Sequence, residues 1–391
     1  GPNSYTGEDV VEFNLHGSPI LIKEALGIIA SAGARLAEAG EFTFRAFMNG
    51  KMSLTQSEAV NQLIHARSDA GMRNAFLQLK GSLQEKLTGL RDGIFEVLSN
   101  FEADIEFPEE GLNTITDNEA SAKLGDFREE LEQLKDSYTL GRKIEDGVKI
   151  VICGPPNSGK STLLNTLLNK DRAIVHESPG TTRDIVEDNI EVKGALIRLI
   201  DTAGIRKDAG EIEEKGIRKT YESIRNADLV LLVHCADSPQ EVNDSLHKHI
   251  VNIIDGDRGA GTVTRIYSKG DLLDQEHKDE IMNSMKNTEL LISATEGWGL
   301  KELEEIISRE LESLNTENIE GNIITSLRQE QLLSTCSEAV FRAIEGINAE
   351  TPKEYLSIDL NESLDSLDQL IGLRPTDDVY DLIFSKFCVG K

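Results

Sequence analysis

The sequence of 391 residues has few cysteines, fewer basic than acidic residues, and no long apolar run. Its four cysteines include no Cys-x-x-Cys pair, so we expect free thiols in a reducing compartment. The 41 Lys and Arg residues against 69 Asp and Glu residues give a formal net charge of -28. This charge argues against non-specific nucleic-acid binding by a broad basic face, although it allows a local basic patch. Because no apolar run approaches the ~20 residues of a membrane span, we expect a cytoplasmic protein without membrane contact.

A glycine-rich turn lies between a predicted strand and a predicted helix. Residues 148–153 indicate a buried strand, residues 154–161 match the pattern G-x-x-x-x-G-K-S, and residues 162–168 begin a helix. Such a turn directs backbone N–H groups and the positive helix end into one small volume, which suits a polyphosphate. We expect Lys160 to reach the β- and γ-phosphates and the Ser161 hydroxyl to bind Mg²⁺.

Two further motifs belong with this turn. Residues 196–200 predict a second buried strand, which ends in the D-x-x-G motif of residues 201–204. Asp201 is suited to hold the water shell of Mg²⁺, and the glycine of the motif allows a backbone N–H to meet a γ-phosphate. Between the two motifs, Thr182 is the candidate for a mobile residue that closes on Mg²⁺ when the γ-phosphate is present.

Two later loops predict guanine recognition. Residues 268–271 (Ser-Lys-Gly-Asp) and 293–295 (Ser-Ala-Thr) each follow an apolar run and resemble the N-K-x-D and S-A-x loops of GTPases. Asp271 accepts hydrogen bonds from guanine N–H groups that adenine lacks, and Lys269 would stack along the base. Ser268 replaces the usual asparagine, so we expect lower guanine affinity or a less rigid loop. The five motifs, in this order on alternating strands and helices, predict a GTPase.

The predicted GTP-binding residues all come from these loops. They are Asn157, Ser158, Gly159, Lys160, Ser161, Thr162, Thr181, Thr182, Asp201, Thr202, Ala203, Gly204, Ser268, Lys269, Asp271, Ser293, Ala294 and Thr295. Ile205 lies directly after D-x-x-G, where a glutamine often positions the attacking water. Because isoleucine cannot do this, another group must assist hydrolysis. The candidates are a carboxylate among Asp208, Glu211, Glu213 and Glu214, and a monovalent cation held by the Asn157 carbonyl.

The N-terminal part of the chain mixes two patterns. Residues 1–51 combine a strand-like run at 9–15 with a helix from 20 to about 32, as an incomplete α+β domain would. The spacing of residues 53–56 is that of a capping box. Apolar helical periodicity then continues to about residue 101, which indicates one long helix or a pair.

Helical stretches lie on both sides of the GTPase motifs. They are predicted at about 117–140, 324–347 and 356–371. We favour one helical domain built from both flanks with the G domain inserted into it, because insertion is tolerated where the ends of a module lie close together. Two independent helical bundles are the alternative.

Several motifs outside the nucleotide loops are more specific. They are SYTGED at residues 4–9, HG at 16–17, GEFTFRAF at 40–47 and IFSKFCVGK at 383–391. With these motifs and the G-domain set, the chain closely resembles the tRNA-modification GTPase MnmE (TrmE) family over nearly its whole length. No general GTPase requires the F-C-[IV]-G-K tail.

This resemblance implies a multidomain protein of α/β plus α class. Residues 1–51 would be a partial α+β domain for tetrahydrofolate binding and dimerisation, without its first part. Residues 52–144 would form the first part of an all-α helical domain, and residues 145–315 an inserted P-loop G domain of Ras-like fold. Residues 316–391 would complete the helical domain and carry the FCVGK tail.

The resemblance also implies an activity with named partners. Family members are homodimers that form a heterotetramer with the FAD protein MnmG and act on tRNA. They place an aminomethyl or carboxymethylaminomethyl group on the ring carbon of the wobble uridine, using a one-carbon unit from a tetrahydrofolate derivative. Their GTP hydrolysis is stimulated by K⁺ and by dimerisation of the G domains.

Particular residues acquire roles from the resemblance. Ser161 and Thr182 would bind Mg²⁺, and Glu213 would orient the hydrolytic water. The implied K⁺ contacts are Asn157, His176, Ser178 and Thr181, and the implied folate contacts are Glu12, Lys51 and Lys391. Cys388 would take part in the modification chemistry, or it is a small apolar residue that packs the tail.

Two other functions fit part of the pattern. A ribosome-assembly GTPase could use the helical flanks as an RNA or protein scaffold without any modification chemistry. The acidic flanks and the specific tail argue against that alternative. A signalling GTPase with passive helical arms is disfavoured because the glutamine after D-x-x-G is missing.

Overall fold

The computed structural model describes residues 1, 3–66, 68–107, 115–170, 186–192, 195–201, 221–237, 247–248, 250–252, 262–285, 288–312, 321–373, 383–385, 387 and 390. The chain divides into two compact units. We call Gly1–Ala66, Gly71–Gly141 and Ile319–Lys391 the helical unit, and Arg67–Ala70 with Arg142–Asn318 the sheet unit. Within the described residues, no helix is long and apolar enough to cross a lipid bilayer.

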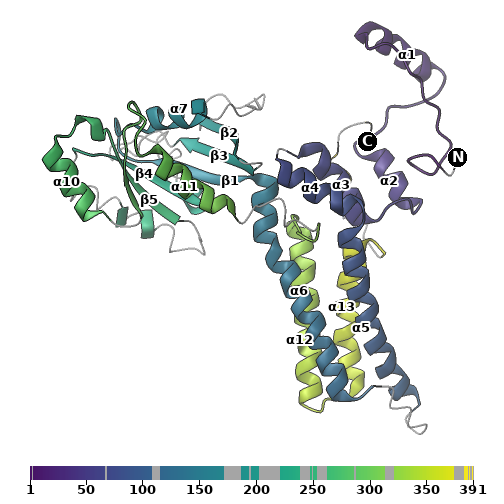
Figure 1. The fold of residues 1–391 in the computed structure, drawn as a ribbon. Helices are drawn as coiled ribbons and strands as arrows, with labels where there is room; N and C mark the ends of the chain where they lie inside the picture. Colours follow the sequence, from purple (N-terminus) through teal and green to yellow (C-terminus); the bar gives the residue numbers. More distant parts are fainter. Residues whose placement is uncertain are drawn as a thin grey trace, which may run out of the picture. The chain divides into compact units, whose positions relative to one another are not determined.

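The sheet unit contains six strands in the order β2-β3-β1-β4-β5-β6. They are β1 (Val148–Cys153), β2 (Val186–Val192), β3 (Ala195–Asp201), β4 (Leu229–Cys235), β5 (Thr262–Ser268) and β6 (Glu289–Leu291). β2 pairs antiparallel with β3, whereas the other four pairings are parallel. Figure 1 shows α7 (Lys160–Lys170), α10 (Gln275–Ser284) and α11 (Leu300–Glu312) around this sheet.

Strands β1 and β4 are mostly apolar, with Lys149 and His234 as the exceptions, as the sequence of β1 predicted. All but one of the six β1 residues are buried, and so are the first six of β4. Strands of a parallel sheet have such apolar sequences because helices cover both faces of the sheet, so neither face needs polar residues. The strands predicted at 148–153 and 196–200 are confirmed.

The carboxyl ends of the parallel strands meet at one edge of the sheet. Ile152 of β1 pairs with Asp201 of β3 and with Leu231 of β4, and Cys235 of β4 pairs with Ser268 of β5. The loops that follow these strands therefore leave from the same edge. In open α/β sheets this edge is where ligands bind.

The helical unit contains eight of the helices that the structure describes. Those in the first part of the chain are α1 (Pro19–Ser31), α2 (Glu41–Met48), α3 (Leu54–His65), α4 (Asp69–Leu79), α5 (Ser82–Glu106) and α6 (Asp117–Asp146). The last two are α12 (Leu327–Asn348) and α13 (Lys353–Ile371). The predicted helices at 117–140, 324–347 and 356–371 are thus confirmed.

Four long helices, α5, α6, α12 and α13, lie side by side in the helical unit (Figure 1). Their shared core is made of aliphatic side chains spaced three or four residues apart on each helix. The most buried members include Leu83, Leu87, Ile94 and Phe101 of α5, Leu124 and Leu131 of α6, Leu333 and Val340 of α12, and Leu360 and Leu367 of α13. Cys336 is part of this core, and burial raises the pKa of its thiol to about 12.

Two expectations for the first hundred residues were wrong. The periodicity between 54 and 101 belongs to three helices rather than one or two, with a break between α4 and α5 where Gly81 takes φ +103°. The residues at 9–15, all described, form no strand. A strand is stable only when its backbone pairs with a neighbour, and a suitable run of residue types supplies no such partner.

The start of α3 is as predicted, and its next turn forms a buried polar contact. Ser53 and Gln56 make both bonds of the capping box. Further along α3, Glu58 accepts hydrogen bonds from Arg328 Nη2 at 3.0 Å and from Gln329 Nε2 at 2.7 Å. Arg328 Nη1 also donates to the Gln369 carbonyl at 3.3 Å, so the contacts of Arg328 join α3, α12 and α13.

We expect Glu58→Ala to lower the free energy of unfolding of the helical unit by about 3 kcal/mol, because Arg328 would stay buried without its partner. The side chains of Arg328 and Glu58 are only 14% and 10% exposed. Urea titrations followed by far-UV circular dichroism measure the change. The matched control is Asp359→Ala, which removes the more exposed Arg342–Asp359 pair and should cost less than about 1 kcal/mol. Equal losses for both variants would contradict this account.

Candidate nucleotide-binding site

The glycine-rich loop lies between the end of β1 and the start of α7, as the sequence predicted. The loop curls around Lys160, whose ammonium donates to the carbonyls of Gly154 at 3.2 Å and Pro155 at 2.8 Å. Asn157 takes the left-handed backbone conformation, with φ 61°. Ser161 and Thr162 follow Lys160 in the first turn of α7. Polar groups and a helix N-terminus therefore face one volume, which is the arrangement that binds phosphate.

The residues of this loop fit a nucleotide phosphate. Ser158 Oγ is buried and has no hydrogen-bond partner among the described residues. A buried polar group without a partner is costly, and such groups are commonly satisfied by a ligand or water. Lys160 is itself only 8% exposed, so its charge acts where water screens it weakly.

Ser268 links this loop to the end of β5. Its hydroxyl lies 2.5 Å from the Ser158 carbonyl and 3.0 Å from the His234 carbonyl, and it can donate its single proton to either. The residue is 4% exposed, so these bonds form away from solvent. The serine that replaces the usual asparagine thus still connects the phosphate loop with the first guanine loop. This contact was not predicted from sequence, because it joins residues 110 positions apart.

The two predicted guanine loops are joined by direct hydrogen bonds. Ser293 Oγ donates to Asp271 Oδ1 at 2.7 Å, and Glu296 N in turn donates to Ser293 Oγ at 3.1 Å. Gly270 N donates to the Ile292 carbonyl at 3.0 Å. Lys269 takes a left-handed conformation with φ 58°, just before the short 3-10 helix η1 (Gly270–Leu272). One carboxylate oxygen of Asp271 is therefore held in place while the exposed residue presents the rest of its carboxylate to solvent.

The sheet register places Asp201, the first residue of the D-x-x-G motif, beside the end of the strand that leads into the phosphate loop. Asp201 ends β3 and pairs with Ile152, two residues before the loop begins at Gly154. The remaining predicted residues of the motif, the switch threonines, the potassium loop and the water-orienting carboxylate lie outside the described residues. These are Thr202, Ala203, Gly204, Thr181, Thr182, His176, Ser178 and Glu213.

A separate cleft of about 890 Å³ lies in the helical unit. It is lined by Asn3, Ser4, Tyr5, Thr6, Val10, Glu12, Phe42, Met52, Val60, Leu79 and Gly390. Of the three predicted folate contacts, Glu12 lines the cleft. Lys51 packs against Gly7, where an added Cβ would lie 3.0 Å from Lys51 Cε. Lys391 and Cys388 lie outside the described residues, although their neighbour Gly390 is part of the lining.

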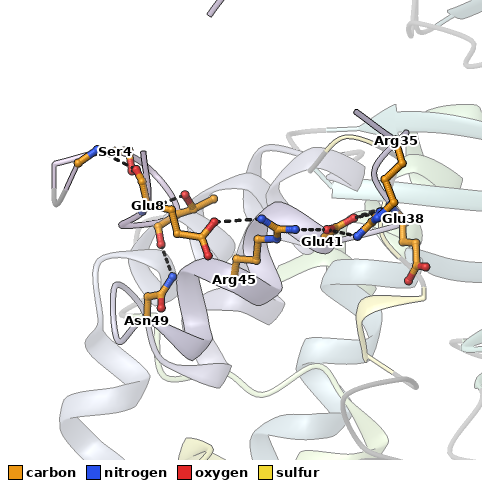
Figure 2. A network of polar contacts seen from close by, with 9 residues as sticks. Ser4, Glu8, Arg35, Glu38, Glu41, Arg45 and Asn49 are labelled. Atoms are coloured by element: carbon orange, nitrogen blue, oxygen red, sulfur yellow. Dashed lines mark hydrogen bonds and ion pairs between the residues drawn. The ribbon is translucent and has the colours of Figure 1, made fainter. Parts of the chain in front are cut away.

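A chain of ion pairs, drawn in Figure 2, lies close in sequence to residues that line this cleft. Arg45 of α2 donates to Glu8 Oε2 at 3.1 Å and to Glu41 Oε1 at 2.6 Å. Arg35 makes two further bonds to Glu41, at 2.8 and 2.6 Å, and these bonds lower the pKa of Glu41 to about 2. Ser4 Oγ donates to the Glu8 carbonyl at 2.6 Å. The loop that contributes Ser4 to the cleft is thereby tied to α2.

Arg35 and Arg45 were not predicted as part of a site. Glu41 and Arg45 are four residues apart on a helix, a spacing that is a recognisable sign of an ion pair. The contact of Arg45 with Glu8, 37 residues earlier, has no such sign in the sequence.

The chain matches known protein families and relatives along its length. Residues 1–51 match the family described as GTP-binding protein TrmE N-terminus, and residues 54–388 match the family described as MnmE helical domain. The tRNA modification GTPase MnmE of Thermotoga maritima is 40% identical over 393 residues, which cover 100% of this chain and 85% of that protein. The proteins of the same name from Clostridioides difficile and Aquifex aeolicus are 36% and 39% identical, with 100% of this chain covered and 84% and 85% of theirs.

Among solved structures, the G domain of the T. maritima FeoB iron transporter is 27% identical and covers 42% of this chain and 99% of its own. Its TM-score of 0.32 is too low to support an inference. The sequence relatives are decisive, because three of them exceed 30% identity along the whole chain. The chain therefore belongs to the MnmE (TrmE) family of GTPases.

Proposed function

We propose that this GTPase couples GTP hydrolysis to modification of the wobble uridine of tRNA. The observation that supports the nucleotide half is the hydrogen bonding among three loops at one sheet edge. Ser268 bonds to Ser158 of the phosphate loop, and Ser293 bonds to Asp271. The tRNA half is supported by the names of the relatives, which are tRNA modification GTPases. The transferred aminomethyl or carboxymethylaminomethyl group would take its one-carbon unit from a tetrahydrofolate derivative.

We propose Mg²⁺ as the metal that accompanies GTP. The hydroxyls of Ser161 and Thr182 are hard oxygen ligands of the kind that Mg²⁺ prefers, and Asp201 would hold the water shell of the metal. The register beside Ile152 supports the placement of Asp201 near the phosphate loop. When bound, Mg²⁺ neutralises charge on the β- and γ-phosphates.

Hydrolysis is proposed to depend on K⁺ rather than on a glutamine. Asn157 is exposed in the phosphate loop with a left-handed backbone, and its side-chain amide carbonyl is a suitable ligand for a monovalent cation. His176, Ser178 and Thr181 would complete the site, and Glu213 would hold the attacking water. A fixed positive charge beside the transferring phosphoryl group stabilises the transition state electrostatically.

The cleft of the helical unit is proposed to hold the folate. Its lining combines a carboxylate, Glu12, with apolar and aromatic side chains such as Tyr5, Phe42 and Met52. A pterin ring is flat and carries an amino-pyrimidinone edge, which a carboxylate can bind through its N–H groups. Lys51 and Lys391 would bind the acidic end of the molecule, and the chemistry attributed to Cys388 would occur at the tail beside Gly390.

The proposed partners are a second copy of the chain, the FAD protein MnmG in a heterotetramer, and tRNA. Helix α1 supports self-association, because none of its thirteen residues is buried although most are apolar. Its exposed large side chains include Ile20 at 76% and Ile28 at 69%. With a net charge of -28, the chain requires a local basic patch or its protein partner to contact tRNA phosphates.

We also propose that the G domain, residues 145–315, is inserted into a helical domain formed by residues 52–144 and 316–391. The two compact units support this division, since Gly71–Gly141 and Ile319–Lys391 belong to one unit and Arg142–Asn318 to the other. Residues 1–51 would form the partial folate-binding domain.

We expect GTP hydrolysis to be at least about tenfold faster in KCl than in NaCl of equal ionic strength. Na⁺ is smaller than K⁺, so oxygen ligands spaced for K⁺ coordinate Na⁺ poorly. Phosphate release under single-turnover conditions measures this ratio. In Asn157→Gly, which retains the left-handed backbone but removes the carbonyl, the ratio should fall toward one. Equal rates in both salts for the unmodified protein would reject the cation role.

We expect Asp271→Asn to weaken GDP binding by roughly a hundredfold, or about 3 kcal/mol, because the amide cannot accept from both guanine N–H groups. The same variant should gain affinity for XDP, whose ring carbonyl can accept from the new amide. Calorimetric titration measures both affinities. Asp274→Asn is the matched control: it makes the same charge change three residues away at the N-cap of α10, where asparagine also caps. If the two variants bound GDP equally, the guanine role of Asp271 would be wrong.

We expect Glu12→Gln to weaken tetrahydrofolate binding by about tenfold, because a charged acceptor is replaced by a neutral amide. Calorimetry under anaerobic conditions measures the affinity without any need for catalysis. Glu24→Gln on α1, outside the cleft lining, is the control and should bind tetrahydrofolate as the unmodified protein does. Unchanged binding by Glu12→Gln would remove this residue from the folate site.

A further inference from the structure

Trp298, the single tryptophan of the chain, packs against the first guanine loop. A Cβ added at Gly270 would lie 2.5 Å from Trp298 Cη2 and 3.0 Å from Leu291 Cδ1. Real Cβ atoms do not approach so closely, so the indole leaves room only for a glycine between Lys269 and Asp271. Trp298 is 37% exposed, so part of its surface faces solvent while the Cη2 end of the indole lies against Gly270.

The backbone of Trp298 closes the second guanine loop. Ser293 N donates to the Trp298 carbonyl at 3.1 Å, and Gly297 N donates to the Ser293 carbonyl at 2.8 Å. These two bonds fix Ser293, whose hydroxyl donates to Asp271. One residue thus contacts both loops: its ring limits the position of Gly270, and its carbonyl fixes the residue that orients the Asp271 carboxylate.

The indole is also contacted by α10. Lys278 Nζ lies 5.8 Å from the ring centroid, within the range of a cation–π attraction. Gly270 N donates to the Ile292 carbonyl, which holds the first guanine loop against the end of β6. The ring is therefore held between α10 and the guanine loop, and a smaller side chain would leave Gly270 without this support.

We propose that Trp298 is a positioning residue for guanine recognition, which acts by fixing the direction of the Asp271 carboxylate. The proposal rests on the proposed binding of the guanine base at Asp271. The expected ligand is a guanosine nucleotide whose exocyclic amine reaches this carboxylate. Trp298 contributes no bond to the nucleotide. Its effect is therefore on discrimination between bases, and the phosphates bind as before.

GDP and IDP separate this role from a general structural one. IDP has the same phosphates and ring N–H as GDP but lacks the exocyclic amine. In Trp298→Ala we expect GDP affinity to fall about tenfold, the loss typical of one charge-assisted hydrogen bond, while IDP affinity falls much less. Trp298→Phe keeps an aromatic ring and should retain most of the selectivity. Met282→Ala, which truncates an exposed apolar residue of α10, is the control and should bind both nucleotides normally.

A double-mutant cycle tests the contact itself. Gly270→Ala alone should lower GDP affinity because its methyl group meets the indole, and Trp298→Ala should remove most of that additional loss. Calorimetry on the full chain gives all the affinities. An unchanged GDP-to-IDP ratio in Trp298→Ala, or full additivity in the cycle, would overturn the positioning role. If the unmodified chain bound neither nucleotide, the proposed GTP site would fail instead.

Discussion

The hydrogen bond between the Ser268 hydroxyl and the Ser158 carbonyl connects the two halves of the nucleotide site. The proposed phosphate and guanine loops are joined by residues 110 positions apart in sequence, and a nucleotide of fixed length would require a fixed distance between the loops. Parallel pairing of β1, β4 and β5 brings the two loops to one edge of the sheet. The buried hydroxyl then fixes their separation. Serine can do this because its short side chain reaches the carbonyl directly.

At the same edge of the sheet, two loop residues have strained backbone conformations that neighbouring contacts hold in place. Asn157 and Lys269 are two of the three non-glycine residues with positive φ among the described residues. Such conformations cost energy and persist only when their surroundings enforce them. Here the ammonium of Lys160 holds the phosphate loop by donating hydrogen bonds to carbonyls of that loop. Contacts with Ser293, Ile292 and Trp298 hold the guanine loop. The site is therefore largely organised by protein contacts alone.

The helical unit uses a different principle, since its stability comes from a long aliphatic core together with buried polar contacts such as the one at Glu58. Surface ion pairs lie close in sequence to residues that line its cleft. Arg45 ties the Glu8 loop to α2, and the low pKa of Glu41 keeps that carboxylate ionised well into the acidic range.

Local features were predictable from the sequence, and contacts between distant segments were not. Strand β1 and the capping box of α3 follow from residue type and spacing within a few positions. The strand expected at 9–15 was wrong because strand formation depends on a partner elsewhere in the chain. Glu58 and Arg328 are 270 residues apart, and nothing near either residue indicates the other. The packing of Trp298 on Gly270 likewise depends on the meeting of two loops.

The most direct test of this account is the equilibrium binding of GDP and ADP to the unmodified chain in the presence of Mg²⁺. In the proposed site the carboxylate of Asp271 would accept from two N–H groups of guanine, and adenine lacks these donors at the same positions. The account predicts that GDP binds at least about a hundredfold more tightly than ADP. Equal affinities, or tighter binding of ADP, would contradict it.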